Sequence, residues 1–482
     1  MLKSSLIIRQ IQTDKMTKID DTSRTEIISA KELFKKNNRF DLIIKYLYVK
    51  AREENLNTDV YEQLYKAHIK AFNNFKDNHK ACYEDFINSF HKTIDSIKNN
   101  GFDETISTIR VNQNYECFDG SHRVAIAAYF DLPVTIVKYD HTESYDYNFF
   151  RHRELNQFYS DIAALEYCKF DKDIFIVNIQ PKINISDDSA IEGIIRKYGQ
   201  IFYKKNVFIN KNGHLHLKLI SYGTQFKEGW IGDYSNNFSG AKNHVQLTTG
   251  KNPLRAYIVK GMERGNALKL KREIRDCFNI GNAPVHINDS YEEALELAQT
   301  YFNENSLHFI NNSPIKENKL FMEQFNYFKS WLADNRLNPD EFCIDGSSPM
   351  TVYGVRKGKD LDFLHYRESL PDLERNDVSK HNKELKNYTL SKDDIIFNPQ
   401  NHFYHKGIKS ISLEVLLKMK KKRAEFPKDY NDIILINYTL KPSIQLFAKI
   451  MLVHFPDHWR VFKRKPFKYI ECALRGRLKR IM

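Results

Sequence analysis

Apolar residues recur at helical spacing through the first hundred residues. In RFDLIIKYLYVKAREE, Leu42, Ile43, Tyr46 and Leu47 fall on one face of a helix, and YEQLYKAHIKAFNNF repeats this spacing. A third segment, YEDFINSFHKTIDSIKNNGF, ends in Asn-Asn-Gly, which is typical of a helix C-terminus. The pattern predicts a helical region up to about residue 79, followed by one more helix.

Short apolar runs bounded by turn residues predict strands farther along the chain. Residues 107–111 and YECF form an expected hairpin, and VTIVKY is a further strand after a small-residue helix from Val124 to Tyr129. Strands are also expected at FIVNI, QIFYKKNVFINK, HLHLKLISY and LRAYIVKG. An Asn-Gly turn at Asn212 and Gly213 would join the second and third of these into a hairpin.

Two later segments of the middle region also have an informative pattern. PVHINDSYEEALELAQTYFNENSLHFIN predicts a strand, a helix capped by Asn288 or Asp289, and a second strand, an order typical of a parallel βαβ unit. ALKLKREIRDCF predicts a helix with Leu268, Leu270 and Ile274 inward. Its outer face would be basic, formed by Lys269, Lys271, Arg272 and Arg275.

Two features of this middle region suggest a ligand site, and each has a plainer explanation. His286 and Asp289 follow the first predicted strand of the βαβ segment, where α/β ligand sites usually lie, but a single His at a strand end is more often structural. GWIGDYSNNFSGAKNHVQ predicts a loop rich in Gly, Asn and Ser, which could bind a ligand or serve only as a connection.

Length and composition indicate a basic protein with several domains. The 482 residues are enough for two to four domains, and 41% hydrophobic residues are enough for ordinary cores. Lys plus Arg (74) exceed Asp plus Glu (61) by 13. Such a balance favours polyanionic partners, namely nucleic acid, anionic lipid, or the phosphates of nucleotides and glycans.

Cysteine spacing and hydropathy predict a cytoplasmic location. No two cysteines are spaced as CxxC, which predicts reduced thiols and argues against a zinc site. The six are Cys82, Cys117, Cys168, Cys277, Cys343 and Cys472. The apolar run in MLKSSLIIRQIQTDK is too short for a secretory signal, and no run reaches the length of about 18 residues that a membrane span needs.

The stretch EFCIDGSSPMTVYGVRKGKDLDFLHY, residues 341–366, predicts a site for a metal ion. It predicts a strand at 342–344, a polar turn, a helix from Met350 to Val355, a basic loop and a second strand. Because side chains alternate along a strand, Asp360 and Asp362 should share one face. Two adjacent carboxylates favour a hard divalent cation, and we expect Mg²⁺.

The turn in this stretch, formed by Gly346, Ser347 and Ser348, predicts a phosphate site. It stands directly before a helix, where backbone N–H groups and a hydroxyl suit phosphate oxygens. Together, the turn and the carboxylates predict binding of a nucleoside triphosphate with its Mg²⁺.

This order of a Gly-Ser turn and an Asp-x-Asp strand resembles the nucleotidyltransferase superfamily, and within it the LicD and fukutin-like transferases, over about residues 331–437. The resemblance implies transfer of a phosphocholine or polyol-phosphate group from a CDP-linked donor to a surface glycan. It also implies that Asp360 and Asp362 hold Mg²⁺ and that the turn holds the donor phosphates. Lys357 or Lys359 would neutralise the charge of the leaving group.

One part of the superfamily pattern is missing. A third carboxylate normally comes from a later strand, and the predicted strand near Lys409 offers none, with Asp394 and Glu414 as the poorly placed substitutes. Farther on, three residues stand where related families place an Arg-Asp-x-x-Asp-like element: Lys428, Asp429 and Asp432.

A second motif, Asp119-Gly120-Ser121-His122-Arg123, opens the small-residue helix. A Gly-Ser turn at a helix N-terminus, with His and Arg beside it, suits phosphate. Over about residues 94–138 the sequence resembles the ParB/sulfiredoxin superfamily, which implies that these residues contact nucleotide phosphates or assist phosphoryl transfer. The sulfiredoxin reaction itself is not expected, because its cysteine lies within the motif and Cys117 lies before it.

The C-terminal tail differs in composition from the rest of the chain. Residues 441–482 mix Leu, Phe, Ile, Met and Trp459 with Lys and Arg and contain almost no acids. A basic amphipathic segment with aromatic residues predicts attachment to an anionic membrane surface. A nucleic-acid patch and a docking helix for a protein partner are the alternatives.

We therefore expect a multidomain α/β and α+β protein. Its five parts are a helical N-terminal region (1–79), a ParB/sulfiredoxin-like α+β module (80–142), a central α/β domain of unknown role (143–318), a nucleotidyltransferase-like α+β domain (319–440) and the basic amphipathic tail (441–482).

The leading functional hypothesis is a Mg²⁺-dependent, nucleotidyltransferase-like transferase of phosphorus-containing groups. It would act in bacterial surface polysaccharide biosynthesis (capsule, O-antigen or teichoic-type) on a glycan or lipid-linked glycan acceptor, at the inner face of the plasma membrane. The ParB-like module would be a second nucleotide-binding or kinase site. One alternative is a nucleotide-switched, ParB-like DNA-binding protein, although no helix-turn-helix follows Asp140. Another is a nucleotidylating toxin or defence effector. Nucleic acid is the less favoured partner.

Overall fold

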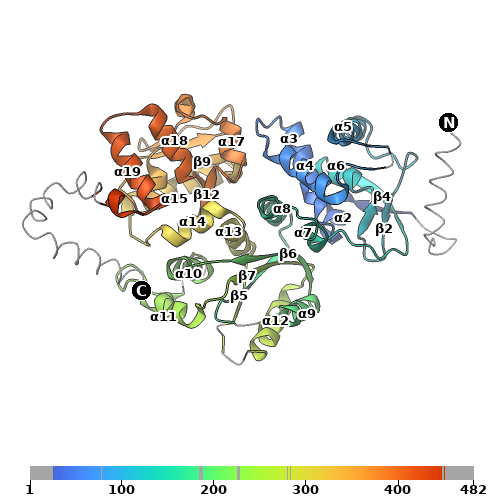
Figure 1. The fold of residues 1–482 in the computed structure, drawn as a ribbon, viewed down its shortest axis with the longest axis horizontal. Helices are drawn as coiled ribbons and strands as arrows, with labels where there is room; N and C mark the ends of the chain where they lie inside the picture. The colour runs from blue at the N-terminus through green and yellow to red at the C-terminus, as the bar shows by residue number, and fades with distance from the viewer. Residues whose placement is uncertain are drawn as a thin grey trace, which may run out of the picture.

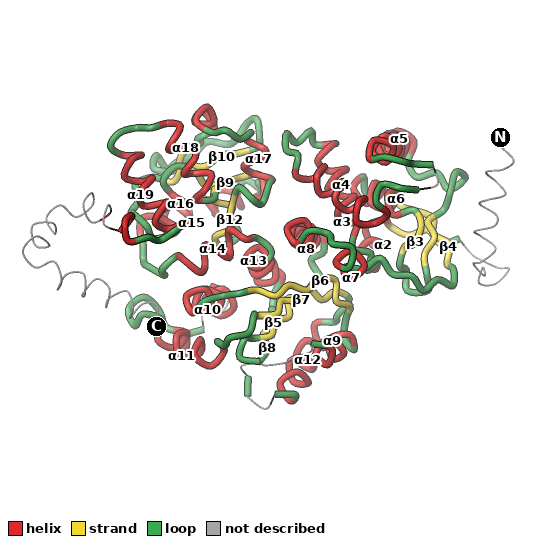
Figure 2. Tube along the Cα trace, in the orientation of Figure 1, coloured by secondary structure: helices red, strands yellow, loops and turns green. Residues whose placement is uncertain are grey.

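The computed structural model describes residues 25–77, 79–183, 188–224, 228–278, 281–282, 284–447 and 450. Within them the protein is mixed α/β, with many helices and three small sheets (Figure 1, Figure 2). The sheets belong to successive parts of the chain, which we call the N-terminal, central and C-terminal units. No helix in these ranges is long and apolar enough to cross a membrane.

The sheet of the N-terminal unit has the order β1-β4-β2-β3. Its strands are β1 (Glu26–Ser29), β2 (Ile109–Val111), β3 (Cys117–Asp119) and β4 (Pro133–Lys138). β2 and β3 pair antiparallel, which confirms the predicted hairpin, whereas β2 and β4 are parallel. β1 pairs with β4 and precedes residue 79, so this sheet extends across the predicted boundary between the first two parts.

Five helices pack on this sheet and on one another. They are α2 (Ala30–Lys36), α3 (Asp41–Glu53), α4 (Val60–Asn73), α5 (Tyr83–Asn100) and α6 (Ser121–Tyr129). The predicted helices are confirmed. In α3, Leu42, Ile43 and Leu47 are buried as expected, whereas Tyr46 is half-buried, and several residues outside the predicted face are buried as well. α5 ends at Gly101, whose φ of 76° is readily adopted by glycine. α6 begins at Ser121, three residues earlier than predicted.

The sheet of the central unit is entirely antiparallel, in the order β6-β7-β5-β8. Its strands are β5 (Phe175–Ile179), β6 (Gln200–Val207), β7 (Leu254–Lys260) and β8 (Val285–Ile287). The helices that pack around it are α7 (Tyr147–Arg151), α8 (Gln157–Phe170), α9 (Ser189–Arg196), α12 (Arg264–Asp276) and α13 (Tyr291–Tyr301). α9 and α12 lie on the side of the sheet away from the other two units (Figure 1).

The predicted parallel βαβ unit is wrong. The segment after α13 forms a helix, α14 (Glu304–Asn312), and not a strand. The Asn303 side chain accepts a hydrogen bond from the Ser306 N–H and so caps this helix, and Leu307 and Ile310 pack at helical spacing. The apolar run Leu-His-Phe-Ile is too short for its period to separate a helix from a strand.

The predicted hairpin at Asn212 and Gly213 is also wrong. HLHLKLISY forms α10 (Lys211–Lys218) and a π-helix, η1 (Leu219–Thr224). The Asn210 side chain accepts from the Gly213 N–H and starts the helix, so this residue acts as a cap instead of part of a strand. The predicted loop that follows contains a 3₁₀ turn, η2 (Gly229–Ile231), and α11 (Ser239–Thr248).

The inward face of α12 differs in part from the prediction. Leu270 and Ile274 are buried as expected, but Leu268 is 59% exposed. Lys271 is buried, and its Nζ lies 3.2 Å from Asp289 Oδ1. α13 begins at Tyr291, so its cap is Ser290, whose hydroxyl accepts from the Glu293 N–H, and neither Asn288 nor Asp289 caps it as predicted.

The C-terminal unit contains a five-stranded mixed sheet in the order β11-β10-β9-β13-β12. Its strands are β9 (Phe342–Asp345), β10 (Leu361–His365), β11 (Val378–Lys380), β12 (His402–His405) and β13 (Ile408–Ile411). The helices are α15 (Lys319–Asp334), α16 (Ser348–Val352), α17 (Lys392–Phe397), α18 (Leu413–Arg423) and α19 (Lys428–Leu440), with short 3₁₀ turns η3 (Pro339–Glu341) and η4 (Asn382–Asn387). The predicted strand at 408–411 and the helix after it are confirmed.

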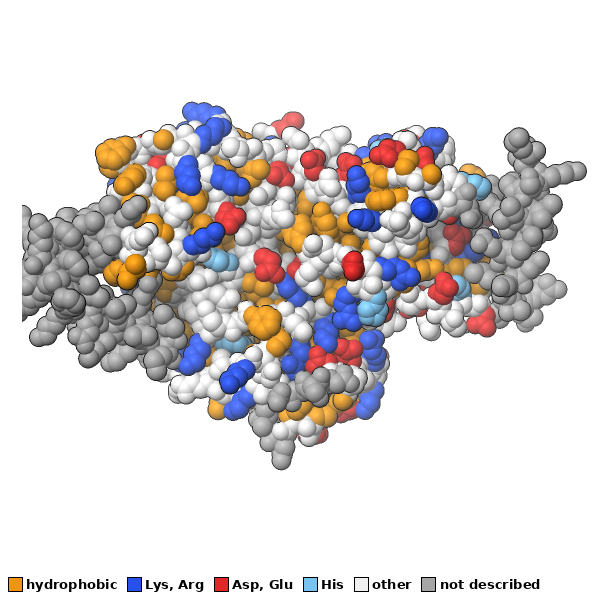
Figure 3. All heavy atoms as spheres, in the orientation of Figure 1, with side chains coloured by type: hydrophobic (Ala, Val, Ile, Leu, Met, Phe, Trp, Pro, Cys, Tyr) orange, Lys and Arg blue, Asp and Glu red, His pale blue; other side chains and the backbone are white. Residues whose placement is uncertain are grey.

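One hydrophobic core joins the three units. A single cluster of buried apolar side chains runs from Ile28 in β1 to Ile436 in α19 and includes residues around all three sheets. The charged side chains on the surface that Figure 3 shows do not gather in one place. On this face, Lys and Arg side chains of the described residues are interspersed with Asp and Glu and form no single basic patch.

Candidate functional site

Two neighbouring strands bring a pair of carboxylates together in the C-terminal unit. β9 and β10 are antiparallel, and Asp345 at the end of β9 stands opposite Asp362 in β10. Asp345 is completely buried. The sequence reasoning ended this strand at residue 344 and therefore missed Asp345, although an acid directly before the Gly-Ser turn was visible in the sequence.

The turn after β9 lies directly under the Asp362 carboxylate. Gly346 has a φ of 64°, and a Cβ at this position would come within 3.2 Å of Asp362 Cβ and Cγ and still closer to Oδ2. Both the backbone conformation and the space therefore require glycine here. The predicted phosphate turn and the predicted metal ligand are in contact.

The two serines of the turn have different roles. The Ser348 hydroxyl donates to the backbone oxygen of Asp360 (3.0 Å) and is buried, so it ties the turn to the start of β10. Ser347 precedes α16, and its backbone oxygen accepts from the Met350 N–H. Its hydroxyl makes no hydrogen bond to any described residue, which leaves it free for a ligand. α16 spans Ser348–Val352, earlier than the predicted helix from Met350 to Val355.

Asp360 and Asp362 flank a buried leucine at the start of β10. Asp360 lies one residue before the strand and is exposed, whereas Asp362 is half-buried and accepts from the Ser379 hydroxyl (2.7 Å). Burial raises the pKa of Asp362, although His381 and the Ser379 hydrogen bond act in the opposite direction. A cation between the two carboxylates would favour their charged forms.

Asp345 is held by its own partners. His381 Nδ1 lies 2.8 Å from Asp345 Oδ2, and the Tyr388 hydroxyl donates to Oδ1. Burial alone would lower the pKa of His381, but the hydrogen bond to Asp345 and the charges of Asp345 and Asp362 raise it above its ordinary value. The protonated His381 therefore balances the buried negative charge of Asp345, the residue that pairs with Asp362 across the two strands.

The loop between α16 and β10 presents two lysines to solvent. Lys357 and Lys359 are exposed. Arg356 fixes the loop by an ion pair with Asp432 in α19 (3.1 Å), and Asp432 also pairs with Lys420 (2.7 Å). Asp432 is buried in this network, as is Asp429, which pairs with Lys420 and Arg423. The Asp-x-x-Asp element predicted from Lys428, Asp429 and Asp432 thus anchors helices and the basic loop.

Neither predicted substitute for the third carboxylate reaches the site. Asp394 accepts from the Thr58 hydroxyl of the N-terminal unit (2.9 Å), and Glu414 lies in the first turn of α18. The described residues contain no group of three or more His, Cys, Asp or Glu side chains that could hold a metal ion by themselves. Any metal here would need ligands from a substrate or from water.

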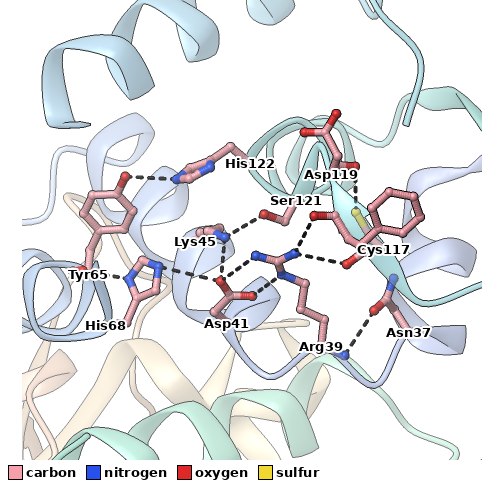
Figure 4. A network of polar contacts seen from close by, with 11 residues as sticks. Asn37, Arg39, Asp41, Lys45, Tyr65, His68, Cys117, Asp119, Ser121 and His122 are labelled. Atoms are coloured by element: carbon pink, nitrogen blue, oxygen red, sulfur yellow. Dashed lines mark hydrogen bonds and ion pairs between the residues drawn. The ribbon is translucent and has the colours of Figure 1, made fainter. Parts of the chain in front are cut away.

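The second motif is built into a buried polar network of the N-terminal unit (Figure 4). Lys45 Nζ donates to the Ser121 hydroxyl and to Asp41, each at 2.7 Å, and Arg39 pairs with the same aspartate. All four side chains are buried. Burial lowers the pKa of Lys45 to about 8, even though Asp41 opposes this shift. Ser121 therefore helps to satisfy an ion cluster.

The remaining residues of this motif also have partners within the protein, including Asp119, which lies 3.8 Å from Arg110 Nε. His122 Nε2 lies 3.0 Å from the Tyr65 hydroxyl, and burial lowers its pKa well below the ordinary value. Arg123 donates to the Ser107 backbone oxygen (3.1 Å) and packs against Gly120, where a Cβ would lie 2.9 Å from its guanidinium. Asp119 is half-exposed and 3.9 Å from Arg123. The phosphate contacts expected of this motif stay a prediction.

Comparison with known proteins adds no further constraint. No family model, no curated protein and no solved structure matches this chain. Both superfamily resemblances therefore depend on the motifs and on the geometry described above. Most of the predicted membrane-binding tail, 441–482, lies outside the described residues.

The ion cluster of the N-terminal unit leads to a stability prediction. Asp41→Asn leaves Arg39 and Lys45 buried without a counter-charge, so we expect a loss of about 3–5 kcal/mol in the stability of this unit. Hydrogen exchange of α3 and α6 amides, followed by mass spectrometry, should accelerate by a factor of about 100 or more. Asp131→Asn is the control, since Asp131 pairs with Lys31 at the surface and should cost under about 1 kcal/mol. Equal effects of the two variants would contradict this account.

The Asp345–His381 pair leads to a pH-dependent prediction. Because the folded-state pKa of His381 is raised, its stabilising effect is fully present below the unfolded pKa of about 6.5 and is lost as pH rises through the folded value. The Tm difference between wild type and His381→Gln should therefore shrink between pH 5.5 and 8.5. Burial lowers the pKa of His365, so the corresponding difference for His365→Gln should change in the opposite direction. Parallel trends for the two variants would show that the assignment is wrong.

Proposed function

We propose that the C-terminal unit is a Mg²⁺-dependent, nucleotidyltransferase-like transferase of phosphorus-containing groups. The observation that carries the proposal is the contact between the Gly346 turn and the Asp362 carboxylate. A phosphate seated on the turn would lie beside a carboxylate that can share its metal ion. In a transferase that uses a nucleotide-linked donor, these two elements have to be adjacent.

The available ligands fit Mg²⁺ that arrives with a nucleotide. Mg²⁺ is commonly held by one or two carboxylates together with substrate phosphates and water, not by an all-protein cage. Asp360 is exposed and Asp362 half-buried, so both carboxylates can meet a ligand from solvent. When bound, the ion would neutralise phosphate charge and act as a Lewis acid.

The neighbouring residues would position the donor. The free hydroxyl of Ser347 and the amides of the turn would hold phosphate oxygens, and Ser348 fixes the turn to β10. Lys357 or Lys359 would approach the leaving group, because the Arg356–Asp432 ion pair holds their loop in place. Asp345 and His381 would act as positioning residues behind the turn.

A cavity bounded in part by α16 offers room for an acceptor. Its volume is about 620 Å³, and Thr351 and Val352 of α16 line it, whereas Gly346, Ser347, Asp360 and Asp362 do not. Because α16 begins directly after the turn, the same helix borders both. Phe309 and Phe321 are among the apolar residues of the wall. We infer from the LicD-like resemblance that the acceptor is a surface glycan or its lipid-linked precursor, reached from the cytoplasmic side.

The test is calorimetric titration of the full chain with CTP, ATP, UTP and a CDP-linked donor. We expect one of them to bind in Mg²⁺, and Asp362→Asn to weaken that binding at least tenfold, about 1.4 kcal/mol. The expected loss arises because the metal ion would lose a charged ligand.

The matched control is Asp372→Asn, in the exposed segment between β10 and β11. It changes the net charge equally and should leave affinity unchanged. Binding that is independent of Mg²⁺, or equal in all three proteins, would refute the proposal. Arg123→Ala, measured in parallel, would show whether the N-terminal motif is a separate nucleotide site.

A further inference from the structure

A second group of polar and aromatic side chains surrounds Tyr222 in the central unit. Tyr222 lies in the π-helix η1, and such helices are frequent at functional sites. Its ring centroid is 5.2 Å from that of Trp230, 5.3 Å from that of His286 and 6.1 Å from that of His244. Lys218 Nζ is 6.0 Å from the Tyr222 centroid. These residues come from α10, η1, η2, α11 and β8 and are separate from the Gly346–Asp362 site.

A fixed chain of hydrogen bonds forms one side of this group. Glu293 Oε1 lies 2.5 Å from His286 Nε2, and its other carboxylate oxygen accepts from the Asp289 N–H (2.8 Å). His286 therefore donates from Nε2, which leaves Nδ1 to accept from the Tyr222 hydroxyl (3.2 Å). Both oxygens of the Glu293 carboxylate therefore already have hydrogen-bonding partners within the protein.

Two cations near Tyr222 have no counter-ion among the described residues. Lys218 is 4% exposed, and no described residue accepts a hydrogen bond from its Nζ or lies in ion-pair distance. Burial lowers the pKa of Lys218 to about 8, with no carboxylate acting against it. Arg275, at the end of α12, also has no acceptor among the described residues, and its Nε is buried without a partner. The helix that carries Arg275, α12, packs against β8, the strand that carries His286.

Two histidines near Lys218 also have a buried ring nitrogen without a hydrogen bond. His214 and His244 each have a buried Nδ1 without a hydrogen bond, and burial lowers the pKa of each to about 4, with the charge of Lys218 acting in the same direction. Buried polar groups in native proteins are normally paired, and a buried charge without a partner is costly. Two further carboxylates lie nearby, and each has a partner among the described residues: Glu228 accepts from Trp230 Nε1, and Asp289 pairs with Lys271. The described residues thus provide no acceptor for Lys218 and Arg275.

We propose that this group is a binding site for a small planar anion, in which Lys218 and Arg275 pair with a phosphate or carboxylate and a ring stacks against Trp230 and Tyr222. Trp230 is 44% exposed, so its ring is accessible from solvent. An acidic ligand would provide the counter-charge that the described residues lack. The two sequence features that suggested a ligand site here, His286 and the Gly-rich segment around Trp230, both contact Tyr222.

The experiment uses the full chain carrying Asp362→Asn, in EDTA, so that the proposed Mg²⁺ site cannot contribute. The probes are AMP and benzoate, which combine a ring with an acidic group, and adenosine, which lacks the acid. We expect AMP or benzoate to bind by calorimetry, with Lys218→Met and Arg275→Gln each weakening binding at least tenfold. Adenosine should bind at least tenfold more weakly than AMP. The preferred probe tells whether the acidic group is a phosphate or a carboxylate.

Control variants and the stability of the free protein complete the test. Lys242→Met in α11 and Arg272→Gln in α12 remove the same charges from more exposed positions and should leave binding unchanged. Lys218→Met should raise the Tm of the unliganded protein by about 2 °C, because it removes a buried charge without a partner. The proposal is overturned if neither AMP nor benzoate binds, if the control variants weaken binding equally, or if Lys218→Met lowers the Tm.

Discussion

The close approach of the Asp362 carboxylate to Gly346 is the constraint on which the proposed transferase site depends. It permits only glycine at the turn, and it fixes the distance between β9 and β10 at their polar ends. The residues around it maintain this contact. Ser348 ties the turn to the Asp360 backbone, Ser379 orients the carboxylate, and the Arg356–Asp432 ion pair holds the following loop. The proposed function depends on this placement of a turn that would hold phosphate beside a carboxylate that would hold the metal ion.

Buried cations in this protein differ in how they are satisfied. Lys260 has no carboxylate in ion-pair distance among the described residues, and its Nζ donates to the Asn37 backbone oxygen. Around Asp41 in the N-terminal unit, and around Lys420 in the C-terminal unit, each buried cation faces a buried carboxylate. Those clusters hold helices together and require no ligand. Lys218 and Arg275 are different, because no described residue balances them. Comparing the clusters identifies the Tyr222 group as a place where an external anion would restore the balance.

Much of the secondary structure could be predicted from the sequence, because long amphipathic helices such as α3 and strands such as β5 and β7 have a clear period. The errors fall on short segments where a cap decides the outcome. Asn210 and Asn303 start helices through side-chain hydrogen bonds, and neither bond is visible as a hydrophobic pattern. The prediction of the site was similarly partial. Asp360, Asp362 and Gly346 were recognised from a motif, but Asp345, His381 and Tyr388 meet only through strand pairing and distant segments.

The most direct test of the central claim is a crystal structure with Mn²⁺ in place of Mg²⁺ and the preferred nucleotide, using anomalous scattering to locate the metal. The account predicts a Mn²⁺ peak between the Asp360 and Asp362 carboxylates, with a phosphate on the turn at Gly346. A nucleotide bound elsewhere, or Mn²⁺ that contacts neither aspartate, would contradict it.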